Sequence, residues 1–320
     1  MKLLHEIPEE RFLTNAVLTL GSFDGVHLGH HRIFSTVLNT ARRKGGDPVV
    51  ITFTAHPRKV LTPRTPPRIL TTAEEKLRAI KDCGIDTIIM LDFTLEMAAM
   101  SAMDFFNRIV LKRLGVIDVV VGYDHAFGRD REGTADFLRE FSKSRGFAVT
   151  KVEPRNFSAR PVSSTWVRAE IEDGNVAMAA RLLGRHYTLS GKVAHGAGRG
   201  RVLGFPTANV VPDDPDKVIP GDGVYAVNAV IERSETRQGM LNIGVNPTFS
   251  STGRTIEVNI FDFDRDIYDA HLSIEFVDRL REEIRFDSAE ELVRQIHLDR
   301  RRALEILNPE TGVDGYNETP

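Results

Sequence analysis

Two histidines three residues apart follow a glycine-rich turn near the start of the chain, in the segment Gly21 to His30 (GSFDGVHLGH). The apolar run before this segment predicts a strand, and the residues after it predict a helix. A helix amino terminus at the carboxyl end of a parallel strand offers free N–H groups and a positive dipole end to an anion. His27 and His30 lie at i and i+3, so both imidazoles can donate toward the same phosphates, with Gly29 leaving room between them. The segment therefore predicts a phosphate-binding turn.

Such a turn suits in-line chemistry at phosphorus. When a nucleophile attacks the α-phosphorus of ATP, negative charge grows on the phosphoryl oxygens, and donors fixed toward them lower the barrier without a covalent intermediate. Two other interpretations of the histidine pair stay open, namely part of a zinc site and two ordinary surface histidines. Zinc needs a third and usually a fourth ligand, and no cysteine or carboxylate completes the set at ligand spacing.

A second polar cluster, Val162 to Arg168 (VSSTWVR), follows the last strand predicted in this half and begins another helix. Its hydroxyls and backbone N–H groups, with Arg168 one turn later, suit a triphosphate. Taken alone, the cluster is explained more simply as helix capping with Trp166 and Val167 as packing residues.

The second half carries a glycine-rich run from His195 to Gly204, followed by Pro206-Thr207-Ala208-Asn209. Glycines let backbone N–H groups approach phosphate closely, but the run is neither a P-loop nor a dinucleotide fingerprint. Thr207 and Asn209 stand two positions apart, so their oxygens can share one face of an extended segment and bind Mg²⁺ together with nucleotide phosphates. A turn with two internally satisfied polar side chains is the alternative.

One carboxylate in this half is a candidate for proton transfer. In the segment 254–260 (RTIEVNI), alternation turns Glu257 away from the apolar side. A carboxylate there could accept the proton of a substrate hydroxyl as it attacks a γ-phosphate. From the residues alone, a solvated strand glutamate is the preferred interpretation.

The elements that must position these residues differ between the two halves. The first half predicts strands that alternate with helices, which is typical of a parallel, doubly wound sheet. Thr72 with Glu75 predicts a capping box. Glycines stand where helices should end, and two shorter helices follow the last strand. The predicted strands are 16–20, 49–53, 87–91, 118–121 and 148–152, the glycines are Gly45, Gly84, Gly115 and Gly146, and the two helices are 164–172 and 176–183.

From His186 onward the predicted strands come without helices between them, which indicates a small antiparallel barrel. Ser288 with Glu291 predicts a second capping box, which begins a long closing helix. We expect a first domain over 1–184, a barrel domain with its helix over 185–307, and a disordered polar tail over 308–320. The predicted strands of the barrel are 187–193, 224–231, 239–243, 255–261 and 272–277.

Composition narrows the classes of function. The chain has 320 residues, and 42 basic against 45 acidic side chains leave a formal charge of -3, so any anionic substrate must be held locally. Cys83 is the only cysteine, which excludes an internal disulfide and fits a reducing compartment; we expect a buried, inert thiol. No signal peptide or membrane span is apparent. We expect a cytoplasmic protein without nucleic-acid or membrane partners, and the sequence makes no prediction of oligomeric state.

At four places the first half resembles the adenylyltransferase half of the bifunctional bacterial riboflavin kinase and FAD synthetase family. These are Gly21 to His30, Thr52 to Pro57 (TFTAHP), Gly122 to Gly128 (GYDHAFG) and Ser163 to Thr165. The resemblance implies a loop from Gly122 to Gly133 that helps to enclose the nucleotide, in which His125 stands where many relatives carry Phe. It also implies a flavin site bordered by Phe53, His56 and Pro57, and an ATP site formed by Gly21, Phe23, Asp24, His27, Gly29, His30, Asp124, Ser164, Thr165 and Arg168.

The second half resembles the riboflavin kinase module of the same family. The matching segments are 204–209 (GFPTAN), 223–226 (GVYA), 242–244 with 247–249, and 257–263. The resemblance implies that Thr207 and Asn209 hold Mg²⁺, that Glu257 is the general base, and that Arg281 contributes to the flavin site. It implies an ATP site in this half formed by Gly196, Gly198, Gly204, Pro206, Thr207 and Asn209. Tyr268-Asp269 stands where relatives show Tyr-Gly, which we expect to affect a turn.

The expected function is therefore the synthesis of flavin cofactors in two steps. The barrel would phosphorylate riboflavin with Mg-ATP to FMN, and the first domain would adenylylate FMN to FAD with release of pyrophosphate. A relative with a single live activity, an adenylyltransferase for another cofactor precursor, and a non-catalytic flavin-sensing regulator are the alternatives. The two residue sets, His27/His30 and Thr207/Asn209/Glu257, favour the bifunctional enzyme.

Overall fold

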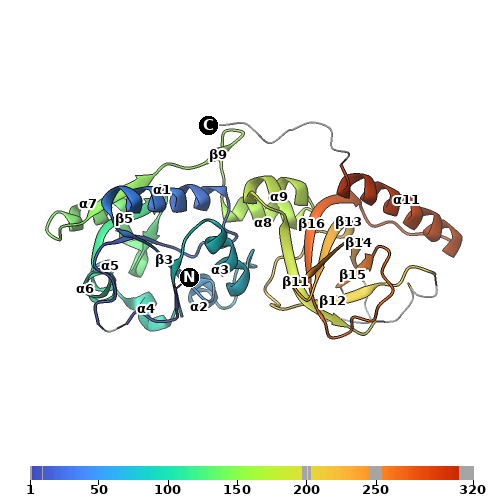
Figure 1. Ribbon diagram of the computed structural model, residues 1–320, viewed down its shortest axis with the longest axis horizontal. Helices are drawn as coiled ribbons and strands as arrows, with labels where there is room; N and C mark the ends of the chain where they lie inside the picture. The colour runs from blue at the N-terminus through green and yellow to red at the C-terminus, as the bar shows by residue number, and fades with distance from the viewer. Residues whose placement is uncertain (1, 9, 197–199, 201–202, 246–253, 310–320) are drawn as a thin grey trace. The chain divides into compact units, whose positions relative to one another are not determined.

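The computed structural model describes residues 2–8, 10–196, 200, 203–245 and 254–309. The chain divides into two compact units, Met1–Val167 and Arg168–Pro320 (Figure 1). This division lies upstream of the expected domain boundary at 184, because α9 (Val176–Leu183) packs against strands β11 and β16 of the barrel. The expected fold class is confirmed: the first unit is built on a parallel sheet, and the second is a closed antiparallel barrel with a terminal helix.

The first unit alternates strands with helices in the order that the sequence predicts. Its sheet strands are β1 Lys2–Leu4, β2 Ala16–Leu20, β3 Asp47–Phe53, β4 Thr87–Leu91, β5 Val116–Gly122 and β8 Ala148–Val152. Its helices are α1 Leu28–Lys44, α2 Pro57–Leu61, α3 Ala73–Asp82, α4 Leu95–Ala99, α5 Ala102–Phe105, the π-helical η1 Phe106–Leu111, α6 Lys112–Leu114, the 3-10 turn η2 Arg129–Arg131 and α7 Ala135–Ser142. Short pairs are formed by β6 Ala126–Phe127 with β7 Gly133–Thr134, and by β9 Asn156–Phe157 with β10 Arg160–Pro161.

The sheet of the first unit has the strand order β1-β4-β3-β2-β5-β8, and every neighbouring pair is parallel. From β2 the chain passes through α1 to β3 on one side, whereas β5 lies on the other side of β2. The order therefore reverses between β2 and β5, and a ligand crevice is expected at the carboxyl ends of the strands there. The edge strand β1 was missed by the sequence prediction, because three residues are too few to show a period.

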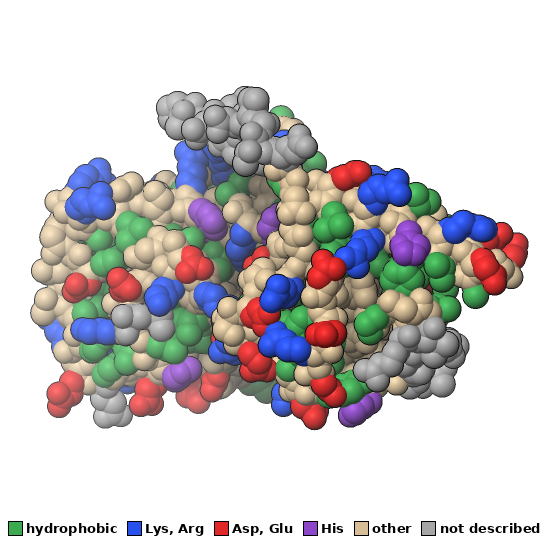
Figure 2. Space-filling view, turned by 45° about the vertical axis from the view of Figure 1, so that its right-hand side comes forward, with side chains coloured by type: hydrophobic (Ala, Val, Ile, Leu, Met, Phe, Trp, Pro, Cys, Tyr) green, Lys and Arg blue, Asp and Glu red, His purple; other side chains and the backbone are tan. Residues whose placement is uncertain are grey.

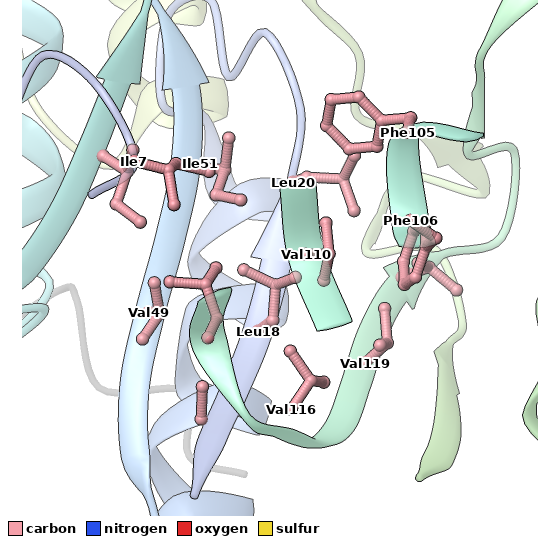
Figure 3. Packing of buried hydrophobic residues seen from close by; sticks show 14 of the residues in the cluster. Ile7, Leu18, Leu20, Val49, Ile51, Phe105, Phe106, Val110, Val116 and Val119 are labelled. Carbon is pink, nitrogen blue, oxygen red and sulfur yellow. The ribbon is translucent and has the colours of Figure 1, made fainter. Parts of the chain in front are cut away.

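Apolar side chains of the sheet alternate between two layers. On one face Leu18 and Leu20 of β2 belong to a cluster with Phe105, Phe106 and Val110 of the α5–η1 segment (Figure 3). On the other face a second cluster contains Val17 of β2, Phe34 and Val37 of α1, and Ile80 of α3. Each fully buried apolar side chain contributes about 1.5–3 kcal/mol to the stability of the fold. Because the sheet is buried on both faces, this packing holds the strands, and therefore their ends, in place.

Local signals define several helix ends as predicted. Thr72 and Glu75 form the expected capping box at the start of α3, with both hydrogen bonds present. Gly45 and Gly115 take the left-handed conformation directly after α1 and α6, at φ 60° and 52°, which glycine adopts without steric cost. One expectation is wrong: Cys83 is partly buried at the end of α3 rather than fully buried.

The second unit begins with helices and continues as a barrel. The helices are α8 Ser164–Glu172, which spans the division between the units, then α9 and the closing helix α11 Ala289–Leu307. The barrel strands are β11 Tyr187–Ala194, β12 Ala208–Pro212, β13 Gly223–Ile231, β14 Glu235–Val245, β15 Arg254–Ile260 and β16 His271–Arg281. They close in the order β11-β12-β15-β14-β13-β16, with β16 hydrogen-bonded back to β11.

Strand β12 was not among the predicted strands, although the sequence around Thr207 and Asn209 was interpreted as an extended segment, with a turn as the alternative. Helix α11 lies against β13, β14 and β16, where Ala303 joins a small apolar cluster with Val224 and Leu280 (Figure 1). At its start, Ser288 accepts from the N–H of Glu291, but the Glu291 carboxylate accepts from the N–H of Asp287 rather than Ser288. The second capping box is therefore only half formed. Of the expected polar tail, residues 310–320 lie outside the described residues.

The surface is chemically mixed. In the view of Figure 2, Lys and Arg side chains are interspersed with Asp and Glu side chains and with hydrophobic ones.

Candidate active sites

The first centre lies at the carboxyl end of β2, beside the point where the strand order reverses. The connection from β2 to α1 contains two bulky residues in the left-handed region, Phe23 at φ 45° and Val26 at φ 43°. Non-glycine residues rarely adopt such angles, β-branched ones least of all, and their strain is held by surrounding structure. Both side chains are buried, so the core holds this turn in shape.

The two histidines of this turn lie together. His27 caps the amino terminus of α1, and its Nδ1 accepts a hydrogen bond from the N–H of Gly29 at 3.1 Å. A neutral His27 ring therefore carries its proton on Nε2. The rings of His27 and His30 stack, with centroids 3.7 Å apart and planes inclined by 19°. A Cβ at Gly29 would lie 3.0 Å from His27 ring atoms, so a larger residue there would displace the ring.

Two residues expected to contact ATP direct their side chains into the protein. The ring of Phe23 packs edge-on against Phe34, with centroids 4.9 Å apart, and a Cβ at Gly21 would lie 3.1 Å from it. Asp24 is only 4% exposed, and its carboxylate accepts hydrogen bonds from the N–H groups of Leu70 and Thr71 at 3.0 Å. At these positions the side chains shape the turn.

The cluster at the start of α8 meets this turn. The Ser164 hydroxyl donates to the backbone carbonyl of Asp24 at 2.8 Å, and the carbonyl of Val162 lies 3.4 Å from the position of a Cβ at Gly29. Thr165 is exposed. Arg168 lies one turn later on the same helix. The structure thus brings Val162 and Ser164, remote in sequence, next to the turn that carries the histidines.

The segment expected to border the flavin begins at the carboxyl end of β3, the strand next to β2. Phe53 is buried and packs edge-on against Phe93, with centroids 5.2 Å apart. His56 caps α2 by accepting from the N–H of Arg58 at 3.2 Å, and Pro57 occupies the first turn. The Thr52 hydroxyl donates to the Ser22 carbonyl at 3.1 Å, which ties this strand end to the phosphate turn.

The loop after β5 lies on the other side of the strand reversal. Asp124 is exposed there, and the pKa of Tyr123 is raised by burial and then by the charge of Asp124. Burial, with a further contribution from Arg131, lowers the pKa of His125 to about 4. His125 is therefore neutral near pH 7, and its ring lies 5.6 Å from that of Phe127. It behaves as an aromatic packing residue.

Sequence reasoning missed one charged residue near this centre. Lys76 on α3 is only 4% exposed, and its Nζ donates to the backbone carbonyl of Phe53. Burial lowers the pKa of Lys76 to about 8, while the charge of Asp24 acts in the opposite direction. The helical spacing was a signal for its burial. Ala79 and Ile80 follow Lys76 by three and four residues, so all three lie on the helix face that packs against the core.

The second centre lies where β12 meets β15 in the barrel. Asn209 stands directly opposite Glu257 in the register of the two strands, and the Thr207 hydroxyl lies 3.3 Å from Glu257 Oε2. Asn242 of β14 is opposite Glu257 on its other side. The structure therefore brings Glu257 together with Thr207 and Asn209, although the sequence separates Glu257 from Thr207 by 50 residues.

The glycine-rich run packs against this cluster. A Cβ at Gly196 would lie 2.0 Å from Asn209 Nδ2, and one at Gly200 would lie 3.2 Å from Thr207 Oγ1. A Cβ at Gly200 would also lie 2.3 Å from the backbone oxygen of Phe205, which excludes a side chain there, whereas one at Gly196 would displace the Asn209 amide. Gly204 takes φ 85°, a left-handed conformation before Pro206. Gly198, and the segment 247–249, lie outside the described residues.

A residue of this centre that sequence reasoning missed is Asn259. It is 6% exposed, and its Nδ2 donates to the Pro206 carbonyl at 2.7 Å, directly before Thr207. Among the described residues, its buried Oδ1 has no hydrogen-bond partner. Asn259 lies two positions after Glu257 on β15, so one strand face positions both sides of the cluster.

Arg281, expected in the flavin site, makes an ion pair inside the second unit. Its guanidinium contacts the carboxylate of Asp299 on α11 at 2.9 Å, and Gln295 donates to the same carboxylate at 2.8 Å. The ring of Phe286 lies 5.8 Å from the guanidinium carbon. In this structure Arg281 holds the closing helix against β16.

The chemistry of the second centre fits Mg²⁺. Hydroxyl, amide and carboxylate oxygens are hard ligands of the kind that Mg²⁺ binds when it also binds phosphates and water. The part of the chain that the structure describes contains no group of three or more His, Cys, Asp or Glu side chains placed to hold a metal by themselves. Thr207 and Asn209 would supply only part of an octahedral Mg²⁺ shell, and waters and nucleotide phosphates are the usual other ligands.

The two sites define a class: a two-domain transferase that uses nucleotide phosphates at two separate centres. Two family models match the chain, one described as FAD synthetase over residues 9–166 and one described as riboflavin kinase over residues 183–307. The chain belongs to the bifunctional riboflavin kinase/FMN adenylyltransferase family.

Relatives of this description match over nearly the whole chain. The protein of that name from Bacillus subtilis is 35% identical, with 94% of each chain covered. That from Pseudomonas fluorescens is 37% identical, over 96% of this chain and 97% of the relative. A solved structure from Streptococcus pneumoniae, described as a macrolide-efflux protein, has a TM-score of 0.84 and 33% identity over 96% of this chain and 98% of its own. In the residues described here, no helix is both long and apolar enough to cross a membrane.

Proposed function

We propose that the chain makes flavin cofactors in two successive reactions, each at one of the two centres. The second unit phosphorylates riboflavin with ATP to give FMN and ADP. The first unit then transfers the adenylyl group of a second ATP to FMN, which gives FAD and pyrophosphate. The observation that carries the proposal is the meeting of Thr207, Asn209 and Glu257 where β12 pairs with β15.

In the kinase reaction Glu257 is the general base. Its carboxylate accepts the proton of the riboflavin ribityl hydroxyl while that oxygen attacks the γ-phosphorus and the bond to the β-phosphate oxygen breaks. Thr207 and Asn209 would hold Mg²⁺ with the nucleotide phosphates, and the ion would neutralise charge on them. The hydrogen bond from Thr207 keeps the carboxylate oriented before substrate binds.

In the adenylyl transfer no protein nucleophile is needed. A phosphate oxygen of FMN attacks the α-phosphorus of ATP, the bond to the bridging oxygen breaks, and pyrophosphate leaves. His27 Nε2 and His30, with the N–H groups at the start of α1, stabilise the charge that grows on the phosphoryl oxygens. Ser164 fixes the turn by bonding the Asp24 carbonyl, while Thr165 and Arg168 complete the triphosphate site. The remaining predicted ATP and flavin contacts belong to the same proposal, as does a cytoplasmic location, which the single cysteine supports.

Two variants test the assignment of the two sites. Glu257→Gln should lower FMN formation from riboflavin by about 100-fold or more, while supplied FMN is still converted to FAD. His27→Ala with His30→Ala should lower FAD formation by about 100-fold or more and leave FMN formation intact. Products are separated by chromatography after incubation with riboflavin or FMN and ATP.

The control for Glu257 is Glu275→Gln, which changes another half-buried strand glutamate of the same barrel and should leave both activities unchanged. Equal loss of both activities in either test variant would refute two independent sites. Absence of FAD with the unaltered chain would refute the assignment of the first unit.

A further inference from the structure

A lysine lies on the core-facing stripe of α3 in the first unit. Lys76, Ala79 and Ile80 are the buried residues of this helix, and Lys76 is 4% exposed. An apolar side chain would fill that position without the cost of burying a charge. An ammonium group taken out of water costs several kcal/mol unless it is paired and hydrogen-bonded. A lysine here therefore needs partners that hold its charge, and these partners indicate its role.

The partners come from two different strand ends. Nζ donates to the carbonyl of Phe53, the last residue of β3. The charge of the Asp24 carboxylate, from the connection between β2 and α1, acts electrostatically on Lys76 and raises its pKa against the effect of burial. On α3 itself, the neighbouring Glu75 is turned back to the N–H of Thr72 in the capping box. The ammonium is thus hydrogen-bonded to the end of β3 and attracted to a carboxylate in the connection that follows β2, the neighbouring strand in the sheet.

Asp24 extends this connection to the site. Its carboxylate accepts from the N–H groups of Leu70 and Thr71, and its backbone carbonyl accepts from Ser164 at 2.8 Å. It lies three residues before His27, in the turn that presents the stacked histidines. Phe53 begins the segment that leads to His56 and Pro57. Lys76 therefore lies behind both the phosphate turn and the segment assigned to the flavin.

We propose that Lys76 is a positioning residue for adenylyl transfer, whose buried ammonium fixes the spacing between the phosphate turn and the flavin-bordering segment through Asp24 and the Phe53 carbonyl. The inference rests on the function proposed above for the first unit. In-line transfer requires the attacking FMN oxygen and the α-phosphorus of ATP to be aligned, and a displacement of about 1 Å can cost about 100-fold in rate. A residue that contacts neither substrate can thus control the reaction by setting the distance between their binding segments.

The first test is Lys76→Met, which keeps an unbranched apolar chain of similar length and removes the charge. FAD formation from supplied FMN should fall by about 30- to 100-fold. FMN formation from riboflavin should stay within about twofold, because it occurs in the other unit of the same chain. The matched control is Lys81→Met on the exposed side of α3, which should leave both rates unchanged. Thermal unfolding shows whether the first unit stays folded at the assay temperature.

The second test separates positioning from structural support by the dependence on pH. Burial lowers the pKa of Lys76 to about 8, so the ammonium is lost as the pH rises through that value. FAD formation by the unaltered chain should fall over the same range. Lys76→Arg keeps a positive charge at every pH of the assay, so this fall should move upward by about one pH unit or more.

The outcomes are distinct. If Lys76→Met is folded and makes FAD at the unaltered rate, or if Lys76→Arg has the same alkaline fall as the unaltered chain, the inference is overturned. A chain that makes no FAD from FMN before any substitution refutes the proposed function instead.

Discussion

Replacing Asn259 by Ala tests whether the kinase centre depends on a side chain that contacts neither of its expected substrates. Asn259 Nδ2 donates to the Pro206 carbonyl at 2.7 Å, and Pro206 leads directly into Thr207 and Asn209. The substitution removes that bond and leaves the rest of β15 in register with β12 and β14. It therefore releases the segment that carries the oxygens proposed to hold Mg²⁺ while leaving Glu257 in place.

The cost in stability should be small. A hydrogen bond of this kind contributes about 0.5–1.5 kcal/mol net. Pro206 is exposed, so water can replace the lost donor at its carbonyl. The variant also removes Oδ1, a buried acceptor without a partner among the described residues, and burying such an acceptor is itself unfavourable. We expect the second unit to lose about 1 kcal/mol or less in its free energy of unfolding.

The cost in rate should be much larger. Displacing Thr207 and Asn209 by a fraction of an ångström to 1 Å should lower kcat/KM for riboflavin phosphorylation by about 10- to 100-fold. Asn259→Asp should be worse, because a buried carboxylate would face the Pro206 carbonyl, so acceptor meets acceptor. The assay is FMN formation from riboflavin, with FAD formation from supplied FMN as the internal reference.

Two results would refute the reasoning about Asn259. One is a kinase rate within twofold of the unaltered chain in a folded Asn259→Ala variant. The other is a large loss of stability with an unchanged rate below the unfolding temperature, which would make Asn259 purely structural.

Two further predictions concern the closing helix and the loop after β5. Asp299→Ala should destabilise the second unit by about 3 kcal/mol, which is at the low end for a broken buried ion pair because the Arg281 side chain is 19% exposed. Denaturant unfolding followed in that unit should show the loss of stability, while the conversion of FMN to FAD persists. An unchanged unfolding transition would mean that the pair does not hold α11. Because the pKa of His125 is about 4 when folded, the unfolded chain binds a proton there first as the pH falls from 7, so stability should decrease toward pH 4 by up to about 3 kcal/mol from this residue. His125→Phe should remove that contribution, and an identical acid dependence of the unfolding free energy in both proteins would contradict the assigned burial.

The sequence alone determined the class of each half and most of its elements. Strands 16–20, 87–91 and 148–152 and helices 164–172 and 176–183 have the predicted bounds, because buried runs of apolar residues and glycine or cap residues at their ends are local signals. The position of the turn from Gly21 to His30 between a strand and a helix was predictable for the same reason, because the signals lie within ten consecutive residues.

What was missed depended on partners far away in the chain. Strand β12 has a weak pattern of its own, and it exists because β11 and β15 pair with it on both sides. Asp24 and Arg281 have the charges expected of ligand-binding residues, but both are paired within the protein. The Asp24 carboxylate accepts from the N–H groups of Leu70 and Thr71, and Arg281 forms an ion pair with Asp299. No local pattern specifies such pairings.

The sequence therefore determined which residues are chemically capable, and the tertiary structure decided which of them meet. His27 and His30 are neighbours by helical geometry, so their stacking follows from spacing. Thr207 and Glu257 meet only because the barrel closes with Asn209 opposite Glu257. The roles inferred for Lys76 and Asn259 come from burial and from hydrogen bonds to backbone carbonyls, which depend on how distant segments pack and not on any motif.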